Sequence, residues 1–318
     1  MAQPTNSFDS YDAVGIREDL SGVITNVSPE EVPFFSACKK TKATNTYHEW
    51  QTDTLRASAA NAHVEGDATT ASARVATTRL GNYTQILKGA VNIPDTDEGL
   101  NKAGRARELA YQIVKLGKEI KKDCEKALFD NNARAAGNSS TAREMAGLPS
   151  WIITNISSGT SGAAATGDGT DAYTDGTQAA FDQTRFDTVM QSIWEEGGNP
   201  DKVYLSAFQM NKALAFTGMN NQRSTIGASV GGTNAVINAV DVYVTPWGTV
   251  EFVPSRENRG RDVFVLQSDM FEVATLRPMR TTQLAKTGDS TTRQIVTELT
   301  LVSKNEKASG AIYDCTTS

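Results

Sequence analysis

Side chains that could perform acid–base or nucleophilic catalysis are scarce in this sequence. The 318 residues include only two histidines, His48 and His63. His48 begins the tripeptide HEW, but no second histidine follows at the spacing of a zinc protease. A Ser–His–Asp arrangement would need a histidine beside a buried nucleophile, and both histidines lie in a polar, strand-like stretch. No Walker-type phosphate loop occurs. We therefore expect no enzyme, no metal site and no cofactor.

A row of lysines is the more informative chemical feature. The lysines are three or four residues apart, which places them in one sector of a helix: Lys115, Lys118, Lys122 and Lys126. Lys118 and Lys122 repel each other at i,i+4, so this face is not optimised for helix stability alone. The plainer interpretation is a solvated face that Glu119 and Glu125 partly neutralise. The alternative is a surface that meets phosphate groups of DNA, or acidic groups of another subunit, without sequence preference.

These lysines belong to a long helical pattern that runs from Asp95 to Asn131. Its apolar residues recur at helical spacing and predict one buried face: Ala106, Leu109, Ala110, Ile113, Gly117, Ile120, Cys124, Ala127 and Leu128. Asp95 and Glu98 have the spacing of a capping box. A continuous helix of this extent would be roughly 50 Å long. We expect it to pack against the strands predicted near the C-terminus.

Composition limits the class of protein further. The net charge is −6, with 39% apolar and 21% charged residues, so any nucleic-acid surface must be local. No apolar run is long enough to cross a membrane and no signal peptide is recognisable, which predicts a protein made in a cytoplasm. The three cysteines are odd in number and far apart, so we expect them to be reduced.

The first 93 residues divide into two segments. Residues 1–44 predict an arm, with Phe34 and Phe35 as anchors. Residues 45–93 predict a long, two-stranded hairpin loop whose tip is polar and carries Glu65 and Asp67. A hairpin of this kind is not stable in isolation, and the sequence offers no obvious neighbour for it within the chain.

Beyond the helix, the pattern changes twice. Residues 157–177 are rich in Gly, Ala, Thr and Asp and predict an exposed, low-complexity loop. Residues 181–278 alternate between helical and strand patterns, with a helix ending at Gly197 and two strands around Pro246–Gly248. Long β segments follow to the end of the chain.

Several fragments, taken in order, resemble a known family. They are GIREDL, SPEEVPFF, HEWQTDTL, VEGD, GRARELAYQ, AGLPSWI, LAKTGDS and NEKASGAI. Together they resemble the major capsid proteins of tailed bacteriophages, in a podovirus-type branch with the Hong Kong 97-type fold. The resemblance extends from Gly15 to Asp314.

This resemblance implies an α+β fold with four parts. They are an N-terminal arm (1–44), an extended hairpin loop (45–93), a peripheral domain (94–147 and 279–318) with a spine helix (95–131), and an axial domain (148–278). It also implies pentamers and hexamers that tile an icosahedral shell around double-stranded DNA, with a portal protein and scaffold or decoration proteins as partners. The hairpin tip would overlie an adjacent subunit, where Glu65 and Asp67 suit a basic partner. The location would be the virion, assembled in the host cytoplasm, with no membrane.

A second function remains compatible with the residues alone. The chain could be an enzyme or a binding module whose pocket lies in residues 181–278, with residues 1–93 as an oligomerisation appendage. A shell protein accounts better for the unsupported hairpin and for the lack of a catalytic set.

Overall fold

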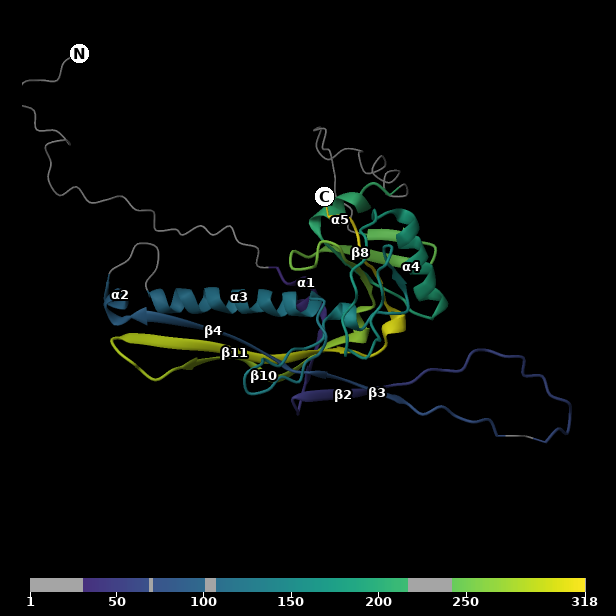
Figure 1. Cartoon of the computed structure of the whole chain (residues 1–318), viewed down its shortest axis with the longest axis horizontal. Coiled ribbons are helices and arrows are strands. Elements are labelled where there is room, and N and C mark those ends of the chain that lie inside the picture. Colours follow the sequence, from purple (N-terminus) through teal and green to yellow (C-terminus); the bar gives the residue numbers. More distant parts are fainter. Residues whose placement is uncertain (1–30, 69–70, 101–106, 217–241, 318) are drawn as a thin grey trace, which may run out of the picture.

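The computed structural model describes residues 31–68, 71–100, 107–216 and 242–317. In the described residues, a long helix lies along one sheet at one end of the molecule (Figure 1). A second sheet with its own helices sits over the other end of that helix. Beyond it, a two-stranded loop extends away from the body.

The first sheet has four strands and carries the long helix on one face. The strand order is β1 (Lys39–Lys42), β10 (Phe271–Gln283), β11 (Ser290–Ser303) and β4 (Gln85–Pro94). β11 is antiparallel to both of its neighbours, β10 and β4, whereas β1 runs parallel to β10. The long β segments predicted near the C-terminus are thus confirmed as β10 and β11.

Helix α3 (Glu108–Phe129) runs along this sheet and packs on β4 and β11. The approach is close at Gly89, where a Cβ atom would lie 2.5 Å from the Leu116 side chain. The predicted face is confirmed in the second half of the helix, where Ile120, Cys124, Ala127 and Leu128 are buried. The first half covers less: Ile113 is half-buried and Ala110 is exposed, contrary to the prediction.

The expectation of one helix over 95–131 is wrong. Residues Asp95–Gly99 form a separate turn, α2, and Leu100 after it is extended (φ −79°, ψ 142°). Gly99 favours this break because glycine is a poor helix former. Residues 101–106, including Ala106 of the predicted stripe, lie outside the described residues. The 22 residues of α3 span about 33 Å rather than 50 Å.

The predicted capping box is also wrong, because its two acidic residues have other partners. The Asp95 carboxylate binds Lys286 and accepts a hydrogen bond from Thr291 Oγ1, both in or near β11. Glu98 Oε2 instead accepts from the backbone N–H of Leu109 at 3.2 Å. Glu98, in α2, therefore satisfies an amide in the first turn of α3.

The hairpin loop has a paired base and an open end. β2 (Tyr47–Thr52) and β3 (Thr78–Tyr83) are antiparallel, and their pairing ends at Thr52 and Thr78. The predicted return strand does not stay in the hairpin, since its continuation is β4 of the four-stranded sheet. The base has a neighbour in the chain, which the sequence did not indicate. Trp50 lies 5.3 Å from Trp151 between ring centroids, and the buried Asn82 amide donates to two backbone carbonyls.

The second sheet has six strands, and its central strands are buried on both faces. Its order is β5 (Ile156–Ser157), β12 (Gly310–Ile312), β9 (Val263–Leu266), β6 (Lys202–Leu205), β8 (Gly248–Pro254) and β7 (Val242–Thr245). In β9, Val263 and Val265 pack towards α4, whereas Phe264 and Leu266 join the core around α3. A strand covered on both faces is apolar without alternation, as the sequence VFVL is. We expected residues 279–318 in the spine-helix domain, but β12 lies inside this other sheet.

Helices cover one face of the second sheet and short turns connect its parts. α4 (Gln183–Glu195) is capped by the Asp182 carboxylate, and Gly197 (φ +91°) follows its end, as predicted. The predicted strand pair around Pro246–Gly248 is confirmed as β7 and β8. Other short helices are α1 (Pro33–Ala37), α5 (Ala207–Ala213), and the 3₁₀ turns η1 (Leu148–Ser150), η2 (Ser268–Met270) and η3 (Glu306–Ala308).

The Gly-rich segment 157–177 is exposed only in part, whereas its composition predicted an exposed loop throughout. Tyr173 is buried and stacks on Tyr313 with ring centroids 4.1 Å apart. Asp175 forms ion pairs with Arg259 and Arg261 at 2.6 and 3.1 Å. The small residues fit because backbone segments pack closely here: a Cβ on Gly159 would lie 1.9 Å from a carbonyl oxygen.

Candidate functional site

The lysine surface, which we define as Lys115, Lys118, Lys122 and Lys126, lies on the side of α3 away from its sheet. Lys118 and Lys126 are exposed. Lys115 pairs loosely with Glu119 at 3.9 Å, and both side chains are about half exposed (51% and 53%). Lys122 is more enclosed (33% exposed) because Glu257, from the loop after β8, pairs with it at 3.6 Å. The structure thus brings the four lysines onto one surface and partly covers Lys122.

One neighbour of these lysines was missed by the sequence analysis. Lys121 is also exposed, three residues after Lys118. Its i,i+3 spacing was the signal that could have found it.

The hairpin tip is a tight turn far from the lysine surface. The backbone N–H of Asp67 donates to the Val64 carbonyl at 3.1 Å, and Gly66 between them has φ +82°, which glycine adopts without strain. Glu65 and Asp67 are exposed, and Asp67 Oδ2 lies 3.4 Å from His63 Nδ1. The tip stands at the far end of the loop in Figure 1. The two sets of predicted site residues therefore do not form one site.

Glu125 has a role that the sequence analysis did not find. We interpreted it as a counter-charge for the lysines, but its side chain is fully buried. Its two oxygens accept from the backbone N–H groups of Phe34 at 3.0 Å and Phe35 at 2.6 Å, and Ser255 Oγ lies 3.5 Å away. Burial raises the pKa of Glu125, and these hydrogen bonds and the Lys40 charge oppose that rise only in part. The carboxylate joins α1, α3 and the end of β8.

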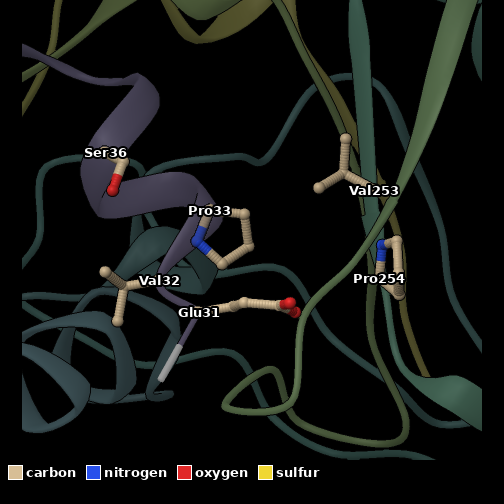
Figure 2. A pocket seen from close by; sticks show the side chains of 6 residues that line it. All are labelled: Glu31, Val32, Pro33, Ser36, Val253 and Pro254. Atoms are coloured by element: carbon tan, nitrogen blue, oxygen red, sulfur yellow. The ribbon is translucent and has the colours of Figure 1, made fainter. Parts of the chain in front are cut away.

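A groove lies next to this junction, between α1 and the end of β8. It has a volume of about 450 Å³ and is lined by Glu31, Val32, Pro33, Ser36, Val253 and Pro254. Figure 2 shows the Glu31 carboxylate extending across the groove towards the strand that carries Val253 and Pro254. One carboxylate and one hydroxyl among apolar side chains give the groove no base–nucleophile pair. Its chemistry suits apolar contact rather than catalysis.

In the described residues, neither the cysteines nor the histidines lie in surroundings that would activate them for catalysis. The three cysteines are buried and unpaired, as expected, and burial raises the pKa of each thiol to about 12. His48 lies beside Trp50 in β2, and His63 is exposed near the loop tip. No group of three or more His, Cys, Asp or Glu side chains that could hold a metal ion occurs in the described ranges.

None of the helices in the described part of the chain combines the length and apolar character needed to cross a bilayer.

A buried charge cluster fixes the segment 157–177 to the rest of the second sheet. Asp314 (φ +57°) accepts from Tyr173 Oη at 2.6 Å, from the Gly176 N–H at 2.9 Å and from Arg261 at 2.5 Å. Burial opposes ionisation of Asp314, but these hydrogen bonds outweigh it and lower its pKa. Nearby Asp262 is fully buried and pairs with Arg259 at 3.1 Å. Here burial dominates and raises the pKa of Asp262 to about 7.

Comparison with known structures places the fold among phage capsids. The capsid asymmetric unit of Cyanophage A-1(L) matches with a TM-score of 0.69 at 10% identity, covering 95% of this chain and 98% of that one. The capsid of Cyanophage P-SCSP1u matches with a TM-score of 0.60 at 14% identity, covering 99% and 97%. The expected α+β fold of the Hong Kong 97 type is confirmed by this likeness.

Comparison of sequences gives the family. The major capsid protein of Escherichia phage Phieco32 is 29% identical over 351 aligned positions, which cover 98% of each chain. The profile of the family described as SU10 major capsid protein matches residues 3–316, almost the whole sequence. This protein therefore belongs to the SU10 major capsid protein family.

Proposed function

We propose that this chain, as the major capsid protein of a phage, closes its shell through the hairpin loop and faces packaged DNA with the lysine surface. Family membership gives the first part, because a major capsid protein forms the icosahedral shell of the virion. Pentamers and hexamers are the assembly units. The single observation that carries the proposal is a hairpin loop whose outer half is covered by none of the described residues of its own subunit.

The hairpin tip contacts an adjacent subunit in this proposal. Residues 53–68 and 71–77 are exposed throughout, including Leu55 (99%) and Val75 (87%). Glu65 and Asp67 at the tip can pair with a basic side chain of that subunit. Each exposed pair contributes only about 0–1 kcal/mol, so the contact depends on repetition over many subunits.

The lysine surface contacts the phosphates of double-stranded DNA without sequence preference. The exposure of Lys115, Lys118 and Lys126 supports this contact. Because the total charge of the chain is −6, the basic surface is confined to this helix face. Lys122 contributes least, because Glu257 already pairs with it. A portal protein, and scaffold or decoration proteins, are further partners in this proposal, and the shell is assembled in the host cytoplasm.

The chain has no catalytic role in this proposal. High thiol pKa values and the surroundings of the two histidines support this. The alternative of an enzyme or binding module with a pocket in 181–278 has less support. The groove of Figure 2 uses only Val253 and Pro254 from that range, and these side chains are apolar.

A pair of charge-matched variants tests the DNA contact. Changing both Lys118 and Lys126 to Gln should leave the melting temperature of the subunit and the yield of particles nearly unchanged. The DNA retained per particle should fall, and the salt dependence of retention should decrease by about one unit of log–log slope per lysine. Lys39 and Lys42 on β1, changed to Gln together, provide the control with the same loss of charge. Equal DNA retention in both double variants would rule out the lysine surface as the DNA contact.

A further inference from the structure

Two crossings of the chain connect the hairpin loop to the body of the subunit. β1 leads into β2 through residues 43–46, and Thr84 alone separates β3 from β4. A backbone hydrogen bond joins the two crossings, from the Thr84 N–H to the Thr46 carbonyl at 2.8 Å. A two-stranded ribbon on so narrow a support twists and bends easily. The direction of the loop in Figure 1 therefore depends on side chains at its base.

Asn82 is the first of these side chains. It is fully buried in β3, between β11 and the segment that precedes η1. Its Nδ2 donates to the Ala146 carbonyl at 3.2 Å and to the Leu301 carbonyl at 3.0 Å, and its Oδ1 accepts from the Ala146 N–H at 2.9 Å. All three partners are backbone groups of the body. A rotation of the hairpin would break at least one of these bonds and leave a buried polar group unpaired, which is costly.

Glu298 anchors the chain two residues further along. Thr84 donates from its hydroxyl to Glu298 Oε1 at 2.7 Å, and both residues are buried. Arg277 Nε donates to Glu298 Oε2 at 2.7 Å. Arg143 binds the same carboxylate and also donates from Nε to the Thr84 carbonyl at 2.7 Å. The crossing at Thr84 is thus held through its side chain and its backbone, in a buried network that is rigid because its members are paired. We call Asn82, Thr84, Arg143 and Glu298 the joint.

Polar contacts explain why the direction of the loop is fixed as well as its position. The rings of Trp50 and Trp151 also pack at the base, but apolar contact is non-directional. Hydrogen bonds weaken steeply when donor and acceptor are misaligned. The joint therefore resists a rotation that the tryptophan contact alone would permit.

The length of the loop turns a small rotation at the joint into a large displacement of the tip. The pairing of β2 with β3 ends at Thr52 and Thr78. The residues from Asp53 to Val64 can extend up to about 40 Å beyond that point. A rotation of about 10° would then move the tip by about 7 Å, which is more than twice the length of a hydrogen bond. Contacts of the tip in an assembly therefore require an accurate angle at the joint.

We propose that Asn82 and Glu298 are positioning residues that fix the direction of the hairpin loop in the free subunit, before it meets a neighbour. This inference rests on the proposed role of the loop in assembly and adds how the loop is aimed. A preset direction removes the ordering cost that a mobile loop would incur on binding. Subunits with a loosened joint should therefore assemble slowly and into shells of irregular size.

Distances between two spin labels measure the direction of the loop. One label is attached through Thr78→Cys, at an exposed position where the paired base ends, and the other through Val114→Cys, at a 61% exposed position of α3. The three native cysteines are buried. In the free, full-length subunit the distance distribution should be narrow, and Asn82→Ala should make it at least about twice as wide. A wide distribution in the subunit that carries only the labels would overturn the inference.

Asn155→Ala is the matched control. Asn155 is equally buried, donates to the carbonyls of Lys307 and Ser309, and accepts from Ser192 Oγ, but it lies beside the second sheet. Each variant loses one side chain with three hydrogen bonds, so both should lower the melting temperature to a similar extent. Only Asn82→Ala should widen the distance distribution. Equal widening in both variants would indicate a general loosening of the subunit and would overturn the assignment.

Glu298→Gln tests the joint by a milder change, and it decides the question if Asn82→Ala does not fold. One carboxylate oxygen becomes an NH₂ group, which cannot accept a hydrogen bond from an arginine. The distance distribution should widen, and electron microscopy should show fewer shells with a broader range of diameters. An unchanged distribution would refute the role of Glu298.

The assembly measurements separate this inference from the proposed function. Normal shells from a subunit with a widened distribution would overturn the link between loop direction and assembly. Failure of the unmodified chain to form any shell would count instead against the proposed function, because the distances in the free subunit do not depend on assembly.

Discussion

Glu125 illustrates what the chemistry of a single residue does and does not disclose. Its place among lysines at helical spacing suggested a surface counter-charge. In the structure it is buried and accepts hydrogen bonds from the first turn of α1. No local pattern distinguishes these two roles, because the partner amides of Phe34 and Phe35 are about ninety positions away in sequence. The same holds for Asn82 and Asp314, whose partners also come from distant segments.

Ile120 should be the most sensitive position of α3. Its side chain is 2% exposed and belongs to the main core, so Ile120→Ala should cost about 2–5 kcal/mol of unfolding free energy. Ile113→Ala should cost less, since Ile113 is only half-buried. Val114→Ala, at a 61% exposed position of the same helix, is the control and should change stability little. Denaturant unfolding of the free subunit measures all three. A larger effect at Val114 than at Ile120 would mean that the helix presents another face to the core.

Asp262 should make stability depend on pH. Burial, reinforced by the charges of Asp175 and Asp314 and opposed by Arg259 and Arg261, raises its pKa to about 7. Between the ordinary aspartate value of about 3.9 and 7, the folded state holds a proton that the unfolded state has lost. The unfolding free energy should therefore fall as pH rises through this window and level off above it.

The Asp262→Asn variant isolates this contribution, because asparagine keeps the shape of the side chain and cannot ionise. The difference in unfolding free energy between the original protein and the variant should change between pH 4 and 7 and then stay constant. Asp314 does not interfere in this window, since its pKa is lowered and its contribution is lost only as pH falls below about 3.8. A difference that is constant from pH 4 to 8 would contradict the raised pKa.

At the scale of elements, periodicity located α3 but not its beginning. The apolar spacing was strong enough to predict the helix and its buried face from Ile120 to Leu128. The predicted start of the helix was wrong because Asp95 and Glu98 form a good local capping pattern that tertiary contacts override. The prediction for the segment 157–177 missed its packing for the opposite reason. Its composition indicates no core, yet its small residues permit close backbone packing.

The hairpin loop should be dispensable for the fold and necessary for assembly. The described residues of the segment 57–73 are all exposed, and deleting the segment leaves the β2–β3 base with its contact between Trp50 and Trp151. The shortened subunit should keep a cooperative thermal transition and assemble poorly, as measured by scanning calorimetry and electron microscopy. Loss of the cooperative transition would show that the loop stabilises the core. Glu65→Gln with Asp67→Asn is the milder comparison, and it should weaken assembly without affecting melting.

At the scale of the whole molecule, the order of fragments carried more information than any motif. The fold class and the shell function were predictable from the sequence because the fragments from Gly15 to Asp314 resemble one family in order and spacing. The lysine surface followed from helical geometry. The groove beside Glu31 and the charge cluster around Asp314 could not be predicted, because each is assembled from several segments that only the tertiary fold brings together.

The position of β12 has a consequence for synthesis of the protein on the ribosome. β12 lies between β5 and β9, although it is the last of the six strands to be translated. The sheet therefore cannot be completed while the nascent chain is shorter than residue 312, whatever has folded before. A polypeptide released early lacks an interior strand, the Asp314 contacts and the anchor of segment 157–177. We therefore expect a polypeptide that ends before residue 312 to fold incompletely and to be excluded from the shell.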